Sequence, residues 1–201
     1  MTIYISEREL EKLCSGHFDA LYFGTLIQRQ DKTRKLLRHI CDVGAFGEVI
    51  CDVNLRDGCY DADSALYCLR SATILKISDE EEPRLRQMGM YQCEHTTAEA
   101  IARCICREYP NVKILLLTMG HNGALAYCGK SGKAYYTPAV PADTVSTVGA
   151  GDSFLAAWCT AYLGGESIEV ASERAAMLSS FVVSRKEAVP DYEIRDGVIV
   201  L

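Results

Sequence analysis

The chain has 201 residues, of which 49% are hydrophobic and 24% charged, proportions typical of a globular protein. Its net charge of −6 argues against a nucleic-acid-binding surface and against attraction to an anionic membrane. No apolar run approaches the roughly 20 residues needed to span a bilayer. The charged stretch SERELEKL lies near the N-terminus, where a signal peptide would have an apolar region. We therefore expect a soluble, cytoplasmic protein that binds neither nucleic acid nor membrane.

Ten cysteines raise the question of a disulfide framework or a metal site. They fall singly along the chain, without any Cys-x-x-Cys pair, and mostly inside apolar runs. Cys104 and Cys106 are the closest pair, but two residues apart on a helix their side chains diverge. The pattern favours reduced, buried thiols over disulfides. It also argues against shared metal ligation by Cys104 and Cys106.

Four short apolar runs read as strands that are buried on both faces, at residues 20–25, 48–54, 72–77 and 112–118. Helical stripes alternate with these runs. The stripes consist of Leu36, Ile40 and Val43, then Ala65, Leu66 and Leu69, then Ala98, Ile101, Ala102 and Ile105. A capping box at Thr96 and Glu99 opens the third helix. The alternation predicts an α/β fold with a parallel sheet covered on both faces.

The pattern changes after residue 118. The runs ALAYCG and KAYYTP flank Lys130–Gly132 and predict a hairpin. A helix with the stripe Phe154, Trp158 and Tyr162 follows and stops at Gly164–Gly165, and a second long helix covers residues 168–182. The tail, residues 192–201, predicts a final strand or hairpin. Without a repeat or linker, the chain is interpreted as a single domain, residues 1–201.

The stretch STVGAGDSF places Gly149, Ala150 and Gly151 directly before a helix and Asp152 in its first turn. Small residues there leave backbone N–H groups uncovered at the positive end of the helix dipole, where phosphate binds. A carboxylate beside a phosphate repels it, but it can accept the proton of a hydroxyl that attacks that phosphate. The alternative is a plain helix start, because glycine and aspartate are both favoured there.

This stretch resembles the C-terminal signature of the ribokinase-like (PfkB) carbohydrate kinases. Three further motifs follow the family's order: DVNLR (52–56), LKISDEE (75–81) and LTMGHNGA (117–124). The resemblance implies a three-layer αβα fold with a mainly parallel sheet and a fructokinase-like transfer of phosphate from ATP to a sugar hydroxyl. It also implies that Gly149–Gly151 form the anion hole and that Asp152 is the catalytic base.

The other motifs carry supporting roles under the same resemblance. Arg56 would reach the terminal phosphates, with Asn54 shaping the same sheet edge. Ser78 and Glu81 stand where the family has Asn-x-x-Glu, which organises Mg²⁺ through water. Thr118, Gly120 and Gly123 would lie beside the nucleotide.

Each of these residues also has a structural interpretation. Arg56 could pair with Asp57 or Asp61 on the surface, and Asn54 could end a strand. Ser78 and Glu81 also fit a capping box. Gly120 and Gly123 could serve a tight connection.

Two departures from the family pattern limit what the resemblance implies. Ser146 stands where many members carry an aspartate associated with a monovalent-cation site, so potassium activation is not predicted. The resemblance covers only the C-terminal two-thirds of the family's domain, without the opening strands, the lid and the Gly-Gly segment that grips the sugar. We therefore expect a gene fragment, a complementing N-terminal segment or a homo-oligomer, and the alternative function is a truncated pseudokinase that binds nucleotide as a regulatory subunit.

Overall fold

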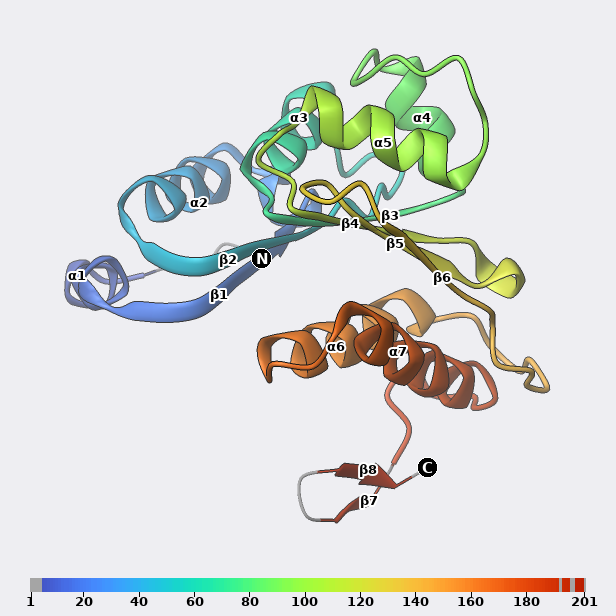
Figure 1. Cartoon of the computed structure of the whole chain (residues 1–201). Helices are drawn as coiled ribbons and strands as arrows, with labels where there is room; N and C mark the ends of the chain where they lie inside the picture. The colour runs from blue at the N-terminus through green and yellow to red at the C-terminus, as the bar shows by residue number, and fades with distance from the viewer. Residues whose placement is uncertain (1–4, 192, 196–197, 201) are drawn as a thin grey trace. The chain divides into compact units, whose positions relative to one another are not determined.

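A computed structural model describes residues 5–191, 193–195 and 198–200 (Figure 1). The strands are β1 (His17–Gly24), β2 (Ala45–Asp52), β3 (Ile74–Ser78), β4 (Ile114–Thr118), β5 (Ala124–Cys128), β6 (Ala134–Thr137), β7 (Glu193–Arg195) and β8 (Val198–Val200). The α-helices are α1 (Glu7–Ser15), α2 (Asp31–Val43), α3 (Ala62–Ser71), α4 (Glu82–Gln87), α5 (Ala98–Glu108), α6 (Ala150–Leu163) and α7 (Ile168–Val183). Two short 3₁₀ helices, η1 (Leu26–Arg29) and η2 (Gly120–Asn122), complete the order.

Six strands form one sheet in the order β1-β2-β3-β4-β5-β6, and β1, β2 and β3 run parallel. All four apolar runs of the sequence are strands of this sheet. β3 and β4 are buried on both faces as expected, whereas the edge strand β1 and the first half of β2 are largely exposed or half-buried. The predicted three-layer α/β class with a mainly parallel sheet is therefore confirmed. The C-terminal hairpin is also present, as the antiparallel pair β7–β8, while residues 192, 196–197 and 201 of the predicted tail lie outside the described residues.

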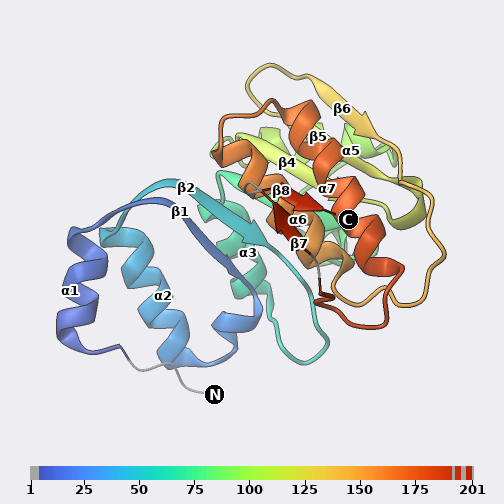
Figure 2. The same cartoon turned by 90° about the horizontal axis from the view of Figure 1, so that it is seen from below.

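The chain divides into two compact units. The first comprises residues 1–117 and 127–134, and in it α3 and α5 lie over one face of β3 and β4 (Figure 1). The second comprises residues 118–126 and 135–201, in which α6 and α7 pack side by side (Figure 2). Trp158 is fully buried there, and its indole N–H donates to the Ser172 hydroxyl at 3.1 Å. The single-domain interpretation stays a prediction.

Two details of the predicted helices are wrong. In α2 the buried residues are Thr33, Leu37 and Ile40, whereas Leu36 is half-buried and Val43 is 43% exposed at the end of the helix. In α5 the N-cap is Thr97, whose hydroxyl accepts the Ala100 N–H, so the capping box predicted one residue earlier does not form. Helices α1 and α4 were not predicted, since both are short and mainly polar.

The cysteines are free thiols wherever their side chains are described, which covers nine of the ten. Three of them are buried and the other six are partly exposed. Cys104 and Cys106 diverge as expected: Cys106 is buried, while the sulfur of Cys104 lies 2.7 Å from that of Cys93. No helix in the described part of the chain is long and apolar enough to cross a membrane.

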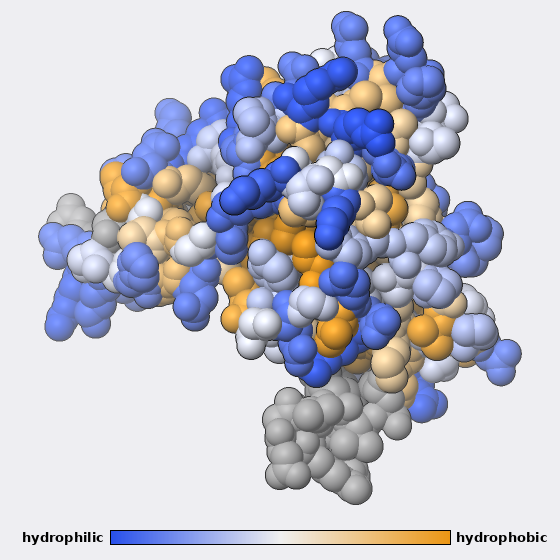
Figure 3. Space-filling view, viewed as in Figure 1, coloured by the Kyte–Doolittle hydropathy of each residue, from blue (hydrophilic) through white to orange (hydrophobic). Residues whose placement is uncertain are grey.

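The surface in Figure 3 is mostly hydrophilic and carries separate apolar patches. The edge strand β1 contributes two exposed aromatic residues, Phe18 at 37% and Tyr22 at 57%. Within the described sheet, β1 pairs with β2 and has no partner on its other side. An open edge with aromatic side chains is a site where another chain can add.

Candidate active site

The helix α6 begins without a side-chain cap. Its N-cap residue is Gly149, in the left-handed region at φ 87°, and a Cβ there would lie 2.6 Å from the Ala188 carbonyl oxygen. Glycine is therefore required by conformation and by space. Helices α1, α3, α5 and α7 are instead capped by the side chains of Ser6, Asp61, Thr97 and Ser167. No side chain caps α6, and the Ala150 N–H donates to the Thr147 carbonyl at 3.3 Å. The N–H groups that follow in the first turn have no side-chain acceptor among the described residues, as an anion site requires.

Asp152 lies in the first turn of α6 with an exposed side chain, and Gly151 before it is half-buried. The turn is fixed through the Ala150 carbonyl, which accepts hydrogen bonds from the hydroxyls of Ser153 (3.0 Å) and Ser179 (3.1 Å). In the part of the chain that the structure describes, no hydrogen bond or ion pair engages the Asp152 carboxylate. This carboxylate can therefore accept a proton from a bound solute.

The loop from Thr118 to Gly123 lies in the same unit as Asp152. It is a tight turn in which the Met119 N–H donates to the Gly123 carbonyl at 2.8 Å. Gly123 has φ 84° and ψ −145°, a region nearly restricted to glycine. A Cβ there would lie 2.2 Å from the Thr137 carbonyl oxygen, whereas a Cβ on Gly120 would meet nothing within 4 Å. Gly123 therefore serves a tight connection, and the exposed Gly120 is accessible to a ligand.

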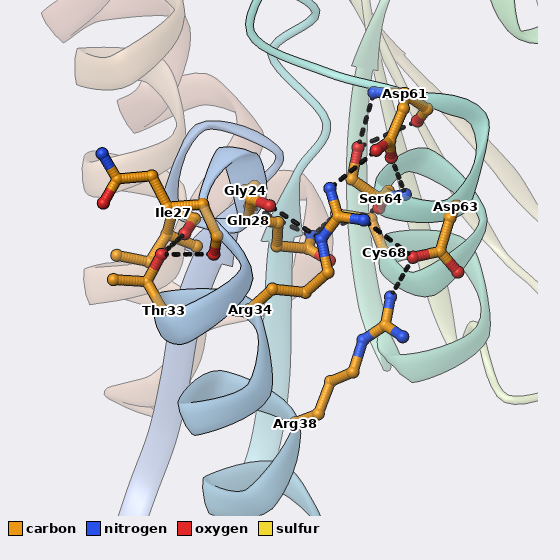
Figure 4. A network of polar contacts seen from close by, with 11 residues as sticks. Gly24, Ile27, Gln28, Thr33, Arg34, Arg38, Asp61, Asp63, Ser64 and Cys68 are labelled. Atoms are coloured by element: carbon orange, nitrogen blue, oxygen red, sulfur yellow. Dashed lines mark hydrogen bonds and ion pairs between the residues drawn. The ribbon is translucent and has the colours of Figure 1, made fainter. Parts of the chain in front are cut away.

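Arg56, in the first unit, is exposed just beyond the carboxyl end of β2. Its Nε donates to the Asn54 side-chain oxygen at 3.3 Å, and it makes no ion pair with any described residue. The two acids considered as its surface partners are held by other arginines. Asp57 pairs with Arg84 at 2.8 Å, and Asp61 pairs with Arg34 at 2.7 Å (Figure 4). Arg56 is thus free to bind an anion, and a guanidinium suits a phosphate.

Ser78 and Glu81 form the reciprocal hydrogen bonds of a capping box. The Ser78 N–H and hydroxyl both donate to Glu81 Oε2, at 2.8 and 3.0 Å, while the Glu81 N–H donates to the Ser78 hydroxyl at 3.2 Å. The second oxygen of Glu81 accepts the Leu55 N–H at 2.6 Å. These reciprocal bonds are present, but they do not cap α4, because the N-cap of that helix is Glu81 and no side chain caps it.

This carboxylate fits a hydrated cation better than a bare one. Both oxygens of Glu81 already accept protein hydrogen bonds, and the described residues contain no group of three His, Cys, Asp or Glu side chains that could cage a metal. Mg²⁺ keeps several waters and usually takes one or two carboxylates together with phosphates. Glu81 can contact such a water through its remaining lone pairs.

The structure thus brings four of the predicted residues together: Asn54, Arg56, Ser78 and Glu81 are joined through the hydrogen bonds around Leu55. The glycines, Ala150, Asp152 and Thr118 belong to the second unit.

Comparison with known proteins decides the family. The sequence model of the pfkB family carbohydrate kinases matches residues 5–195. The chain belongs to this family. It is 32% identical to a ribokinase from Arabidopsis thaliana over 66% of its own length and 34% of the relative's. The chain therefore spans about a third of the length of that relative.

Solved structures show the same fold. The Arabidopsis thaliana ribokinase complexed with ribose and ATP superposes with a TM-score of 0.66 at 25% identity, covering 93% of this chain and 57% of the ribokinase chain. The fructokinase from Vibrio cholerae O395, bound to fructose, ADP and calcium, gives 0.72 at 18% identity, covering 89% of this chain and 59% of the fructokinase chain.

Two features beside this candidate site were not identified from the sequence. Asp52 and Lys76 form a buried ion pair beneath the Asn54–Arg56 loop, and the signal for it was a charged residue in each of two otherwise apolar strands. Thr25 contacts the same loop from the end of β1. No local pattern identifies Thr25, because its partners lie 28 and 29 residues further along the chain.

Proposed function

We propose that this chain carries the phosphoryl-transfer machinery of an ATP-dependent carbohydrate kinase, which moves the γ-phosphate of ATP to a sugar hydroxyl. Family membership supports the reaction class. The single observation that carries the assignment of residues is the start of α6, an uncapped glycine-led helix end followed by the exposed carboxylate of Asp152.

The chemistry follows from these groups. Asp152 accepts the proton of the sugar hydroxyl as its oxygen forms a bond to the γ-phosphorus, while the bond from that phosphorus to the ADP oxygen breaks. The N–H groups at Gly149–Gly151 donate to the phosphoryl oxygens and stabilise their charge. General-base help of this kind contributes about 10²–10⁴-fold in rate.

Arg56, Asn54 and the Thr118–Gly123 loop complete the proposal on the nucleotide side. Arg56 binds the terminal phosphates, since no described carboxylate competes for it. Asn54 orients Arg56, and Gly120 and Gly123 give the nucleotide close access to the backbone. Glu81, positioned by Ser78, would hold Mg²⁺ through water, and the bound cation would neutralise the charge of the phosphates.

We propose a fructokinase-like acceptor, because the motif DVNLR and the LKISDEE stretch follow the fructokinase pattern. The relatives carry the names ribokinase, fructosamine kinase and adenosine kinase. Fructose, ribose and adenosine therefore form the first panel of acceptors.

ADP release on addition of each acceptor tests this function. We expect ADP release with at least one acceptor, and a loss of at least about 10²-fold in turnover for Asp152→Asn with ATP affinity nearly unchanged. Asp143→Asn is the matched control, since Asp143 is an exposed aspartate outside the site. The alternative function, a nucleotide-binding regulatory subunit, is favoured if the chain binds ATP and releases no ADP with any acceptor.

A further inference from the structure

The loop that carries Arg56 contains an unusual backbone conformation. Asn54 has φ 43°, and it is the one non-glycine residue with positive φ among those the structure describes. Asparagine tolerates this region better than most residues, but the conformation still costs free energy and persists only where neighbouring groups hold it. Asn54 lies two residues before Arg56 and accepts a hydrogen bond from its guanidinium.

Three groups hold this conformation in place. The Val53 N–H donates to the Lys76 carbonyl at 3.1 Å, which anchors the loop to β3. The Leu55 N–H donates to Glu81 at 2.6 Å, on the other side of Asn54. Between these anchors, the Thr25 hydroxyl lies within hydrogen-bond distance of the Val53 carbonyl (2.8 Å) and the Asn54 carbonyl (3.1 Å).

Thr25 is well suited to fix the loop. It is fully buried at the end of β1, so water cannot replace its hydroxyl. The adjacent strands meet closely there, since a Cβ on Gly24 would lie 2.4 Å from the Asp52 carbonyl oxygen. The Asn54 carbonyl points at Thr25 only while the peptide plane after Asn54 keeps its left-handed orientation. Loss of the hydroxyl removes this contact and leaves the part-buried Asn54 carbonyl without it.

We propose that Thr25 is a positioning residue for phosphoryl transfer: its hydroxyl holds Asn54 in the left-handed conformation from which Arg56 reaches the phosphates. The inference rests on the proposed phosphate-binding role of Arg56. Thr25 itself touches no substrate. A merely structural role would lower stability and would affect activity to the same degree whether or not Arg56 is present.

The test compares Thr25→Val, which keeps the size and loses the hydroxyl, with Thr25→Ser, which keeps the hydroxyl. Each is made in the wild-type chain and in an Arg56→Ala background. We expect Thr25→Val to lower kcat/KM for ADP release about 10-fold, Thr25→Ser to stay within about 3-fold, and Thr25→Val to have no further effect once Arg56 is absent. Equal losses in both backgrounds would overturn the proposal. If Thr25→Val fails to fold, Thr25→Ala takes its place in the same comparison.

Two readouts do not require turnover. The ¹³Cα and ¹³Cβ chemical shifts of Asn54 report its backbone conformation, and we expect them to change in Thr25→Val and to stay in Thr25→Ser. Binding of inorganic tripolyphosphate, measured by calorimetry, should weaken several-fold in Thr25→Val only when Arg56 is present. A wild-type chain that releases no ADP would contradict the proposed function. The role of Thr25 would be contradicted by Asn54 chemical shifts that do not change in Thr25→Val. It would also be contradicted if Thr25→Val weakened tripolyphosphate binding equally with and without Arg56.

Discussion

Lys76 donates to both carboxylate oxygens of Asp52, at 2.9 and 3.0 Å, from the facing position of the neighbouring strand. Both side chains are almost fully buried, Lys76 at 7% and Asp52 at 1% exposure. Removing one partner leaves an uncompensated buried charge, which costs about 3–5 kcal/mol. Asp52 lies two residues before Asn54, and the Val53 N–H between them donates to the Lys76 carbonyl at 3.1 Å, so the pair stands where the loop with Asn54 and Arg56 leaves the sheet.

We expect Asp52→Asn and Lys76→Met each to lower the free energy of unfolding by about 3–5 kcal/mol in urea denaturation. The double variant Asp52→Leu/Lys76→Met leaves no unpaired charge and should be more stable than either single variant. Asp57→Asn, which breaks an exposed pair with Arg84, is the comparison. If the single variants of the buried pair lost no more unfolding free energy than Asp57→Asn, the buried pair would not be needed for stability.

The strands and the glycine-led helix could be predicted from sequence, because apolar runs and small residues before an amphipathic stripe reflect local requirements. The start of α5 was misplaced by one residue, since Thr96 and Thr97 are both good caps and the local sequence does not distinguish them. The role of Thr25 was out of reach, because it depends on a contact between strand ends that are distant in the chain.

The Thr118–Gly123 loop allows a matched pair of glycine substitutions. Gly120 and Gly123 both have positive φ, but only at Gly123 would a Cβ collide with backbone, 2.2 Å from the Thr137 carbonyl oxygen. We expect Gly120→Ala to cost about 1 kcal/mol and Gly123→Ala about 3 kcal/mol or more in unfolding free energy. Equal costs in thermal or urea unfolding would contradict the close packing of this turn.

Asp61 gives the fold a pH dependence. Partial burial opposes its ionisation, but the hydrogen bond from Arg34, those from Ser64 and the charge of Arg34 outweigh it, so the pKa of Asp61 lies below its ordinary value (Figure 4). A lowered folded-state pKa stabilises the fold above the unfolded-state value of about 3.9, and the effect is lost as the pH falls through the folded-state pKa.

Asp61→Asn keeps an N-cap acceptor for α3 and removes the charge. We expect this variant to have a lower Tm than the wild type at pH 7 and the difference to close as the pH falls below about 4. In an Arg34→Met background the pH dependence of the difference should shrink. If the Tm difference between the wild type and Asp61→Asn stayed constant from pH 7 to below pH 4, the Asp61–Arg34 ion pair would not be its cause.

The open edge of β1 predicts self-association. Tyr22 is 57% exposed on this strand, and an unpaired edge can add a strand from another copy. We expect light scattering to show oligomers of the wild-type chain and Tyr22→Lys to shift them towards monomer. Met177→Lys, at a 53% exposed position on α7, is the control and should change little. A clean wild-type monomer with cooperative unfolding would contradict the expectation.

ADP release on acceptor addition, measured for the wild-type chain and for Asp152→Asn, tests the central claim most directly. We expect ADP release by the wild type with at least one sugar, and turnover at least about 10²-fold lower in Asp152→Asn at nearly equal ATP affinity. Equal turnover in the two proteins would show that Asp152 is not the catalytic base.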